Sequence, residues 1–236
     1  MATLSLVIPC YNEAKSLQSL VVRCAEVFRN EHVEVVLVDN GSNDNTPEIL
    51  ASVLPEHTNI RSVRVNQNRG YGHGILAGLR NCPSRYLGWT HADMQTDPAD
   101  LLQALELLPT SENGNHMFIK GQRIGRPLGD VAFTVAMSAF ETALFARKFW
   151  DINAQPTVFP RTFFETWRKP PEDFSLDLYA YYMAHRSELC IKRFPVRFQK
   201  RAYGKSHWNV DWQSKMKFIK RTVDFSLALR RSGQIK

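Results

Sequence analysis

Short apolar runs alternate with segments of helical period through the first half of the chain. Runs at residues 4–8, 33–38, 59–65 and 86–89 have the length and apolar content of buried strands. The segment at residues 13–28 places its apolar residues on one face of a helix. Strands that alternate with helices in this way predict a parallel sheet with right-handed crossovers.

The second half of the chain has a less regular pattern. We expect helices over 98–108 and 131–150, a strand over 116–120, an irregular polar stretch over 151–160, a helix from about 170 to 185, one or two strands over 189–198 interrupted at Pro195, and a cationic amphipathic helix over 212–231. No apolar run reaches the roughly 18 residues that suggest a spanning helix. The nearest approach, residues 131–140, stops at Glu141.

Two helix starts are predicted from their local sequence. Thr46 precedes Pro47 and Asp97 precedes Pro98, which is the arrangement of a capping side chain before a proline in the first turn. Residues 70–74 read Gly-Tyr-Gly-His-Gly, which resembles a dinucleotide-binding turn. Because this stretch follows the third strand and has G-x-G-x-G spacing, we interpret it as a tight turn into a helix.

Composition and cysteine spacing exclude several classes of protein. With 236 residues, 44% hydrophobic and 22% charged, the chain can bury a full core and is not disordered. The four cysteines lie far apart without a C-x-x-C pair, so neither a zinc site nor a disulfide framework is indicated, and a reducing cytosol is expected. The N-terminus lacks the basic and apolar regions of a signal peptide.

The net charge of +7 is unevenly distributed. From Lys192 onward there are 13 Lys and Arg against two acidic residues, whereas the first 191 residues carry 17 against 21. Apolar residues interleave with the basic ones over residues 212–231, which favours contact with an anionic membrane surface over a merely solvated face. Packing of this helix on the domain is the alternative. Nucleic acid is not expected as a partner, since no recognition motif accompanies the basic segment.

Acidic residues stand at or just after the ends of three predicted strands. Glu13, Asp39 and Asp93 would meet in one crevice, because the carboxyl ends of parallel strands share an edge of the sheet. If the chain stays extended after residue 89, His91, Asp93 and Gln95 project to one side and offer three metal ligands. A carboxylate there can hold a divalent cation that in turn holds phosphate oxygens.

The motifs Ile8-Pro-Cys-Tyr-Asn-Glu13, Val36-Leu-Val-Asp39-Asn-Gly-Ser-Asn-Asp-Asn-Thr46 and Ala92-Asp93-Met-Gln95 resemble those of the family 2 nucleotide-sugar glycosyltransferases of GT-A fold. Within that family the nearest likeness is to the dolichyl-phosphate mannose synthase group and to bacterial polyprenyl-phosphate glycosyltransferases. The likeness runs from residue 4 to about residue 208, with the motifs in the same order and spacing.

The resemblance implies a nucleotide-binding set and a metal site. Pro9, Tyr11, Glu13, Asp39, Ala92 and Asp93 match positions that bind the nucleotide. His91, Asp93 and Gln95 match the family's D-x-D-type motif, which binds Mg or Mn together with the sugar diphosphate. This chain departs from the motif at His91, which replaces the first acid, and imidazole suits Mn better than Mg.

The resemblance also implies residues for catalysis and for the acceptor. Arg123 matches the arginine of a G-S-R segment, and Arg201 and Ser206 match a basic loop that faces the acceptor phosphate. The expected reaction is inverting transfer from a nucleotide-diphosphate sugar to a polyprenyl- or dolichyl-phosphate or another lipid-linked acceptor. A phosphate acceptor is already anionic, with a second pKa of about 6, and needs no base.

Two alternative functions remain open at this point. A glycan hydroxyl acceptor would need a general base, for which Asp177, or in second place Asp173, is the candidate if both lie on one helical turn; a solvated helix start accounts for Asp177 equally well. An inactive nucleotide-binding homologue is the other alternative, prompted by His91.

The expected architecture is an α/β GT-A fold, a Rossmann-like mostly parallel sheet flanked by helices. Residues 1–210 would form one domain, with a nucleotide-binding half at 1–97 and an acceptor half at 98–210. Residues 211–236 would form a basic helical extension. Together with the apolar segment at 131–150, this extension would place the protein on the cytoplasmic face of the membrane as a peripheral enzyme.

Overall fold

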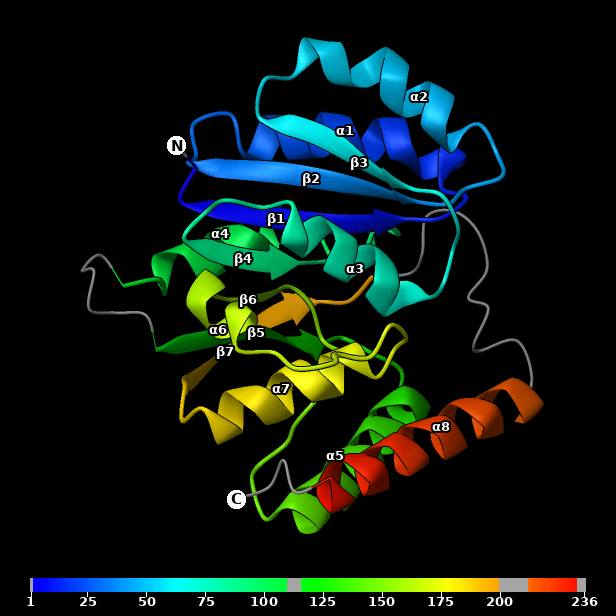
Figure 1. Ribbon diagram of the computed structural model, residues 1–236, viewed down its shortest axis with the longest axis vertical. Helices are drawn as coiled ribbons and strands as arrows, with labels where there is room; N and C mark the ends of the chain where they lie inside the picture. The colour runs from blue at the N-terminus through cyan, green and yellow to red at the C-terminus, as the bar shows by residue number, and fades with distance from the viewer. Residues whose placement is uncertain (1, 110–115, 200–211, 233–236) are drawn as a thin grey trace.

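The computed structural model describes residues 2–109, 116–199 and 212–232, and a mixed sheet of seven strands forms the centre of this part of the chain (Figure 1). The strands are β1 (Leu4–Cys10), β2 (Val33–Asn40), β3 (Ile60–Val65), β4 (Tyr86–Trp89), β5 (Met117–Ile124), β6 (Thr157–Pro160) and β7 (Cys190–Arg197). Their order is β3-β2-β1-β4-β6-β5-β7, and β6 alone among them runs antiparallel to its neighbours. The predicted parallel α/β sheet is therefore confirmed for the first four strands.

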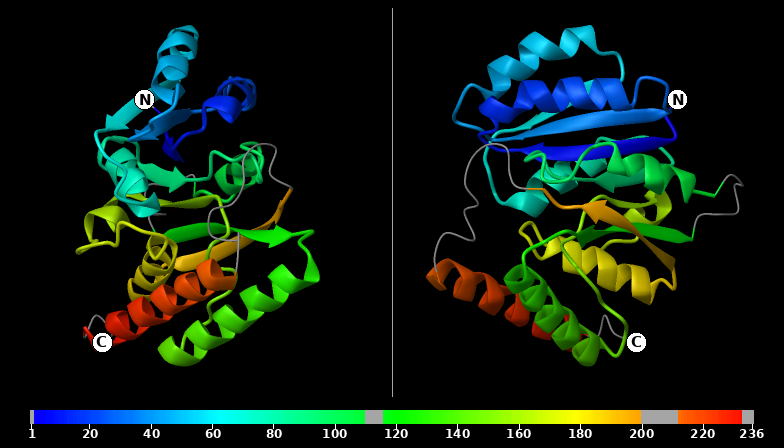
Figure 2. Two further views of the ribbon diagram at one scale, coloured as in Figure 1. Left: turned by 90° about the vertical axis from the view of Figure 1, so that its right-hand side faces the viewer. Right: turned by 180° about the vertical axis from the view of Figure 1, so that it is seen from behind.

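Helices cover both faces of the sheet. They are α1 (Ala14–Val27), α2 (Thr46–Val53), α3 (Tyr71–Arg80), α4 (Asp100–Glu106), α5 (Leu128–Phe145), α6 (Arg161–Glu165), α7 (Leu176–Arg186) and α8 (Trp212–Arg231), with a short 3-10 helix at Leu54–Glu56. The views in Figure 2 show α1 and α4 on one face and α3, α6 and α7 on the other. Alternation along β1 explains the two layers, because Leu6 and Ile8 join the core under α1 while Val7 joins the core under α3.

The close packing of α3 on the sheet depends on a glycine. A Cβ at Gly78 would lie 2.4 Å from a methyl of Val7 and 2.8 Å from a methyl of Val38. Helix α3 begins at Tyr71, directly after Gly70, whose φ of +126° only glycine adopts easily. The interpretation of residues 70–74 as a tight turn into a helix is thus confirmed, and this turn sets the position of Tyr71.

Two predictions for the second half of the sheet are wrong. The stretch expected to be irregular contains β6, which pairs with β4 so that Trp89 lies opposite Thr157. A four-residue strand that follows a polar segment and ends at Pro160 is too short to be predicted from its pattern of apolar and polar positions. Strand β7 also runs without a break through Pro195, which lies opposite Gln122. This is tolerated because β7 is the outermost strand, where a missing N–H removes no pairing on its open side.

Helices α5 and α8 lie side by side at the end of the molecule farthest from β3 (Figures 1 and 2). Leu229 of α8 is 5% exposed, and the Ser226 hydroxyl lies 2.7 Å from Glu141 Oε1 on α5. The C-terminal helix therefore packs on the rest of the chain, which was the alternative to membrane contact. Packing on α5 and contact with a membrane are compatible, since α8 also presents an exposed basic face with Lys217, Lys220 and Arg221.

Helix α5 differs from its sequence-based reading. It begins three residues earlier than expected, and the whole 18-residue helix is long and apolar enough to cross a membrane, although only 22% of it is buried inside the chain. Glu141 does not interrupt its outer face, because this side chain is fully buried against α8. Leu128 is 88% exposed and Val135 43% exposed, so the apolar residues face outward.

Glu141 is a buried acid at the α5–α8 contact. Burial raises its pKa to about 7, against the opposing effect of the Ser226 hydroxyl. The Ser226 hydroxyl has one proton and lies 2.8 Å from the Thr222 carbonyl. When Glu141 is protonated, its O–H donates to the Ser226 hydroxyl, which in turn donates to the Thr222 carbonyl. The hydrogen bonds between α5 and α8 are therefore best satisfied when this carboxyl is neutral.

We predict that Glu141 makes the free energy of unfolding depend on pH. The pKa of Glu141 in the folded protein is raised above that of an unfolded glutamate. Its contribution to the free energy of unfolding is therefore fully present below about pH 4.5 and is lost as the pH rises to about 7. The loss should be roughly 3 kcal/mol. Glu141→Gln mimics the protonated carboxyl, so this slope should vanish and the variant should be the more stable protein above pH 7. Urea unfolding across this range measures the difference.

The matched control is Glu106→Gln, since Glu106 is exposed at the end of α4. This variant should follow the wild-type pH dependence. A Glu141→Gln curve parallel to that of the wild type would show that the carboxyl does not titrate in this window.

Candidate active site

The loops after β1 and β2 are joined at the carboxyl edge of the sheet. Cys10 lies in register with Asp39, and the loops beyond them exchange hydrogen bonds, with Asn12 N–H donating to Ser42 Oγ at 3.0 Å. Glu13 N–H donates to Thr46 Oγ1 at 3.0 Å. Thr46 is thus the first residue of α2 and a brace for the neighbouring loop, and the prediction that it caps the helix is wrong.

Asp39 is buried and keeps one acceptor available. Its side chain is 2% exposed, and Oδ1 accepts the Ser42 N–H at 2.9 Å. Oδ2 accepts no hydrogen bond from any residue that the structure describes, although Arg64 Nε lies 3.4 Å away. A buried carboxylate oxygen in this state suits an N–H or hydroxyl donor from a ligand.

The other residues expected to bind the nucleotide surround this edge. Pro9 lies within β1, Tyr11 follows it and is 40% exposed, and Ala92 is 4% exposed after β4. The Glu13 carboxylate accepts the Ser16 hydroxyl at 2.7 Å. The edge therefore collects an exposed ring, a buried carboxylate and backbone at the ends of three adjacent strands.

The segment after β4 bends and does not stay extended. Met94 has a φ of 56°, and Asp93 Oδ1 accepts the Gln95 N–H at 3.1 Å. The Gln95 amide donates to the carbonyl of Gln199 beyond β7 at 3.2 Å. The expectation that His91, Asp93 and Gln95 project to one side is therefore wrong, because a local carboxylate-to-backbone bond competes with the strand.

His91 and Asp93 nevertheless place an imidazole and a carboxylate, two side chains of the kinds that bind metal ions, in the same bend. Burial lowers the pKa of His91, against the opposing charges of Asp93 and Asp177, so the imidazole is neutral at neutral pH and has a lone pair to donate. The described residues hold no cluster of three or more His, Cys, Asp or Glu. Mg or Mn held by one or two protein ligands and completed by phosphate oxygens requires no such cluster, so the pair fits that kind of site.

Asp177 lies deep beneath this bend. It is 2% exposed in the first turn of α7, where its Oδ1 accepts the Gln155 amide and lies 3.5 Å from Lys120 Nζ. Asp173 precedes the helix and pairs with Arg221 of α8 at 3.3 Å. The two acids are thus not on one helical turn, and they face different surroundings.

Lys120 is a site residue that the sequence did not reveal. The side chain is fully buried on β5, and its ammonium donates to the Ala154 carbonyl at 2.6 Å and to Thr157 Oγ1 at 2.8 Å. Burial lowers its pKa to about 8, against the attraction of Asp177. A lysine at the end of an apolar strand was the available signal, but its partners come from segments more than 30 residues away.

Arg123 is held by a second buried acid. Asp151 is 1% exposed and accepts hydrogen bonds from the Arg123 backbone N–H at 2.8 Å and from its guanidinium at 2.9 Å. Burial opposes ionisation of Asp151, but Arg123 and Arg126 outweigh it and lower the pKa of the carboxyl. The charge of Asp177 raises the pKa of His91, and those of Arg123 and Lys120 lower it. Arg201 and Ser206 lie outside the described residues.

A family model ties these features to known proteins. The model described as glycosyl transferase family 2 matches residues 5–161, which include β2 to β6, all of β1 but its first residue, and both Asp39 and Asp93.

Curated relatives match over about half of the chain. An undecaprenyl-phosphate 4-deoxy-4-formamido-L-arabinose transferase of Pseudomonas fluorescens is 33% identical over 105 residues, which is 43% of this chain and 31% of the relative. A dolichol-phosphate mannosyltransferase of Mycosarcoma maydis is 26% identical over 127 residues, or 51% of this chain and 42% of the relative. The matched region thus spans less than half the length of these relatives.

Solved structures share the fold over nearly the whole chain. Glucosyl-3-phosphoglycerate synthase from Mycobacterium tuberculosis, crystallised with UDP, has a TM-score of 0.70 at 16% identity and covers 97% of this chain and 80% of that one. A mannosyltransferase from Pyrobaculum calidifontis, crystallised with GDP-Man and Mn2+, has a TM-score of 0.65 at 20% identity and covers 92% of this chain and 64% of that one. The GT-A-like fold predicted from the sequence is confirmed.

We predict that the Lys120–Asp177 pair tolerates the loss of both charges better than the loss of one. Lys120→Met leaves Asp177 as a buried charge without its cation and should cost about 3–5 kcal/mol of unfolding free energy. The double variant Lys120→Met/Asp177→Asn should recover part of that loss, because no uncompensated charge remains. Urea unfolding midpoints provide the measurement.

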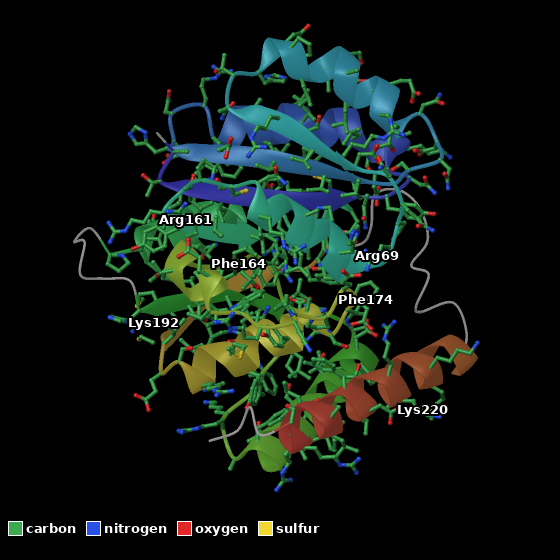
Figure 3. The ribbon with its side chains drawn as sticks, viewed as in Figure 1. Arg69, Arg161, Phe164, Phe174, Lys192 and Lys220 are labelled. Atoms are coloured by element: carbon green, nitrogen blue, oxygen red, sulfur yellow. The ribbon has the colours of Figure 1, made fainter. Side chains whose placement is uncertain are left out.

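Lys192→Met is the matched control, since Lys192 is exposed on the neighbouring strand β7 (Figure 3). It should change stability by less than about 0.5 kcal/mol. Equal effects of the Lys120 and Lys192 substitutions would contradict a buried ion pair.

Proposed function

This chain belongs to glycosyl transferase family 2, and we propose that it transfers a sugar, with inversion, from a nucleotide-diphosphate sugar to a polyprenyl- or dolichyl-phosphate or another lipid-linked acceptor. The observation that carries the proposal is the donor edge of the sheet. There the buried Asp39, with an oxygen that accepts no hydrogen bond from the described residues, stands two strands from the His91–Asp93 bend. A nucleoside and a metal-bound diphosphate need that combination of groups.

The donor would lie across the ends of β2, β1 and β4. Asp39 Oδ2 would accept a hydrogen bond from the nucleoside, with Pro9, Tyr11, Glu13 and Ala92 around it. His91 and Asp93 would hold Mg or Mn, and the ion would neutralise the diphosphate as it departs. The similar Mycobacterium protein was crystallised with Mn2+ and UDP and the Pyrobaculum protein with Mn2+ and GDP-Man, which supports this cofactor. Gln95 is a weaker candidate ligand, because its amide nitrogen is bonded to Gln199.

The acceptor would enter from the side of α5, α7 and the basic residues that follow Lys192. A phosphate monoester attacks the anomeric carbon without giving up a proton, so no general base is required. Arg123, fixed by Asp151, and Arg201 would stabilise the negative charge on the leaving diphosphate, and Arg201 with Ser206 would hold the acceptor phosphate. The names of the relatives, which specify undecaprenyl and dolichol phosphates, support a lipid acceptor.

A glycan hydroxyl acceptor would require Asp177 as base. The 2% exposure of that residue and its bonds to Gln155 and Lys120 favour a positioning role instead. This supports the phosphate acceptor over the hydroxyl acceptor.

We predict that nucleotide binding depends on a metal ion through Asp93 and on a direct contact with the nucleotide through Asp39. Wild-type protein with Mn2+ and either UDP or GDP at 100 times the dissociation constant should gain about 2.7 kcal/mol, which is a thermal shift of roughly 2–4 °C. Asp93→Asn should lose the Mn2+-dependent part of the shift, whereas Asp39→Asn should weaken nucleotide binding with or without the metal. Transfer from UDP- or GDP-sugars to a polyprenyl phosphate then tests the reaction.

The control is Asp97→Asn, an acid of the same segment whose carboxylate binds Arg23 and the Ala99 N–H. It should shift like the wild type. No shift with either nucleotide in the presence of Mn2+ would refute a family 2 donor site, and binding without transfer would indicate an inactive homologue.

We predict that the outer face of α5, flanked by the basic face of α8, rests on the cytoplasmic side of an anionic membrane. Leu128→Asp/Val135→Asp should reduce sedimentation with phosphatidylcholine–phosphatidylglycerol vesicles roughly tenfold, since two apolar side chains lose their burial in lipid. Val22→Asp, at an exposed apolar position on α1, is the control and should sediment like the wild type. Equal sedimentation of all three proteins would exclude this face as the contact.

A further inference from the structure

Four side chains form a continuous stack from α8 to the bend that carries the metal-binding candidates. The Arg221 guanidinium lies over the Phe174 ring, 5.8 Å from its centroid. The Phe174 ring stacks on Tyr71 at 4.7 Å with an 11° interplanar angle, and Tyr71 stacks on His91 at 5.3 Å with a 27° angle. Figure 3 labels Phe174 between Arg69, near α3, and Lys220 on α8.

The middle of the stack is fixed to the core of the protein. Tyr71 is the first residue of α3, and its hydroxyl lies 3.4 Å from the Gln155 amide that also binds Asp177. The backbone of α3 packs closely on the segment that carries Phe174. A Cβ at Gly72 would lie 2.7 Å from the Asp173 carbonyl, and His73 N–H donates to the Glu172 carbonyl at 2.8 Å.

The outer end of the stack depends on α8. Arg221 reaches Phe174 from that helix, and its Nε lies 3.3 Å from Asp173 Oδ2. Helix α8 is otherwise held by its contact with α5. A displacement of α8 would remove a cation from one face of Phe174 and a partner from Asp173, while leaving α3 and the sheet intact.

We propose that Tyr71 and Phe174 are positioning residues for His91, and that through Arg221 the donor site binds its metal and nucleotide best when α8 is docked. The inference rests on the proposed function in taking His91 as part of the donor site. Its chemical content is that imidazole orientation, and with it the metal site, depends on the Tyr71 ring, which stacks on Phe174, and that Phe174 is in turn contacted by Arg221 of the C-terminal helix. The surface that meets the membrane would thereby influence donor binding without touching the donor.

The first test reads the stack without any nucleotide. The imidazole resonances of His91, assigned by their loss in His91→Gln, respond to the position of the Tyr71 ring. Phe174→Leu and Arg221→Ala should both move these resonances, and Phe174→Tyr, which keeps a ring, should restore the wild-type position. Arg231→Ala removes the same charge from the exposed far end of α8 and should leave His91 unmoved.

The second test measures Mn2+·UDP and Mn2+·GDP binding by calorimetry. Arg221→Ala should weaken binding of the accepted nucleotide about threefold and Phe174→Leu about tenfold, as expected for the loss of one cation–π contact and of one stacked ring. Phe174→Tyr and Arg231→Ala should match the wild type. An intact fold is checked by the unfolding midpoint of each variant.

The outcomes separate the inference from the proposed function. If Arg221→Ala and Phe174→Leu leave both the His91 resonances and nucleotide binding unchanged, the coupling is refuted while the donor site stands. If the resonances move but the wild type binds neither nucleotide with Mn2+, the coupling of α8 to His91 stands and the glycosyltransferase proposal fails. If the resonances move and binding does not, the stack positions His91 without affecting the donor, and the proposal is overturned.

Discussion

The ammonium of Lys120 is buried where three segments of the second half of the chain meet. It leaves β5, donates to the carbonyl and hydroxyl of the segment that leads into β6, and faces the carboxylate at the start of α7. A buried charge is costly unless it is satisfied on all sides, so these segments have little freedom to move independently. The same arrangement orients Gln155 toward Asp177 and Tyr71, and so links the second half of the sheet to the donor edge.

The two halves of the sheet are built by different means. The first half is a repeat of parallel strands and crossover helices, β1 to β4, whose apolar residues enter the cores on the two faces. The second half contains the antiparallel β6, beside which Trp89 of β4, Phe159 and Trp167 pack edge to face or tilted. In the second half, polar networks around Lys120 and Asp151 hold the segments in position, as the crossover helices do in the first half.

The residues of the candidate site also divide into two groups. Asp39 and Asp93 stand at strand ends, so their positions follow from strands that the apolar runs already predict. Lys120, Gln155 and Tyr71 acquire their roles only through partners that are distant in sequence, and no motif predicted those roles. His91 falls between these cases. Its place in the motif predicts a ligand, but the stack that orients it joins α3, the segment before α7, and α8.

The sequence by itself determined the parallel part of the sheet, from β1 to β4. The strand at residues 86–89 was predicted with the bounds that the structure has, and Asp39 and Asp93 were assigned to one sheet edge, because buried parallel strands leave a local apolar pattern and their ends have a fixed direction. Tertiary structure alone decided the rest. The four-residue strand β6, the unbroken β7 and the burial of Asp177 depend on pairings between segments far apart in the chain. Local pattern carries no information about such partners, since the energy that favours them is gained only when distant segments meet.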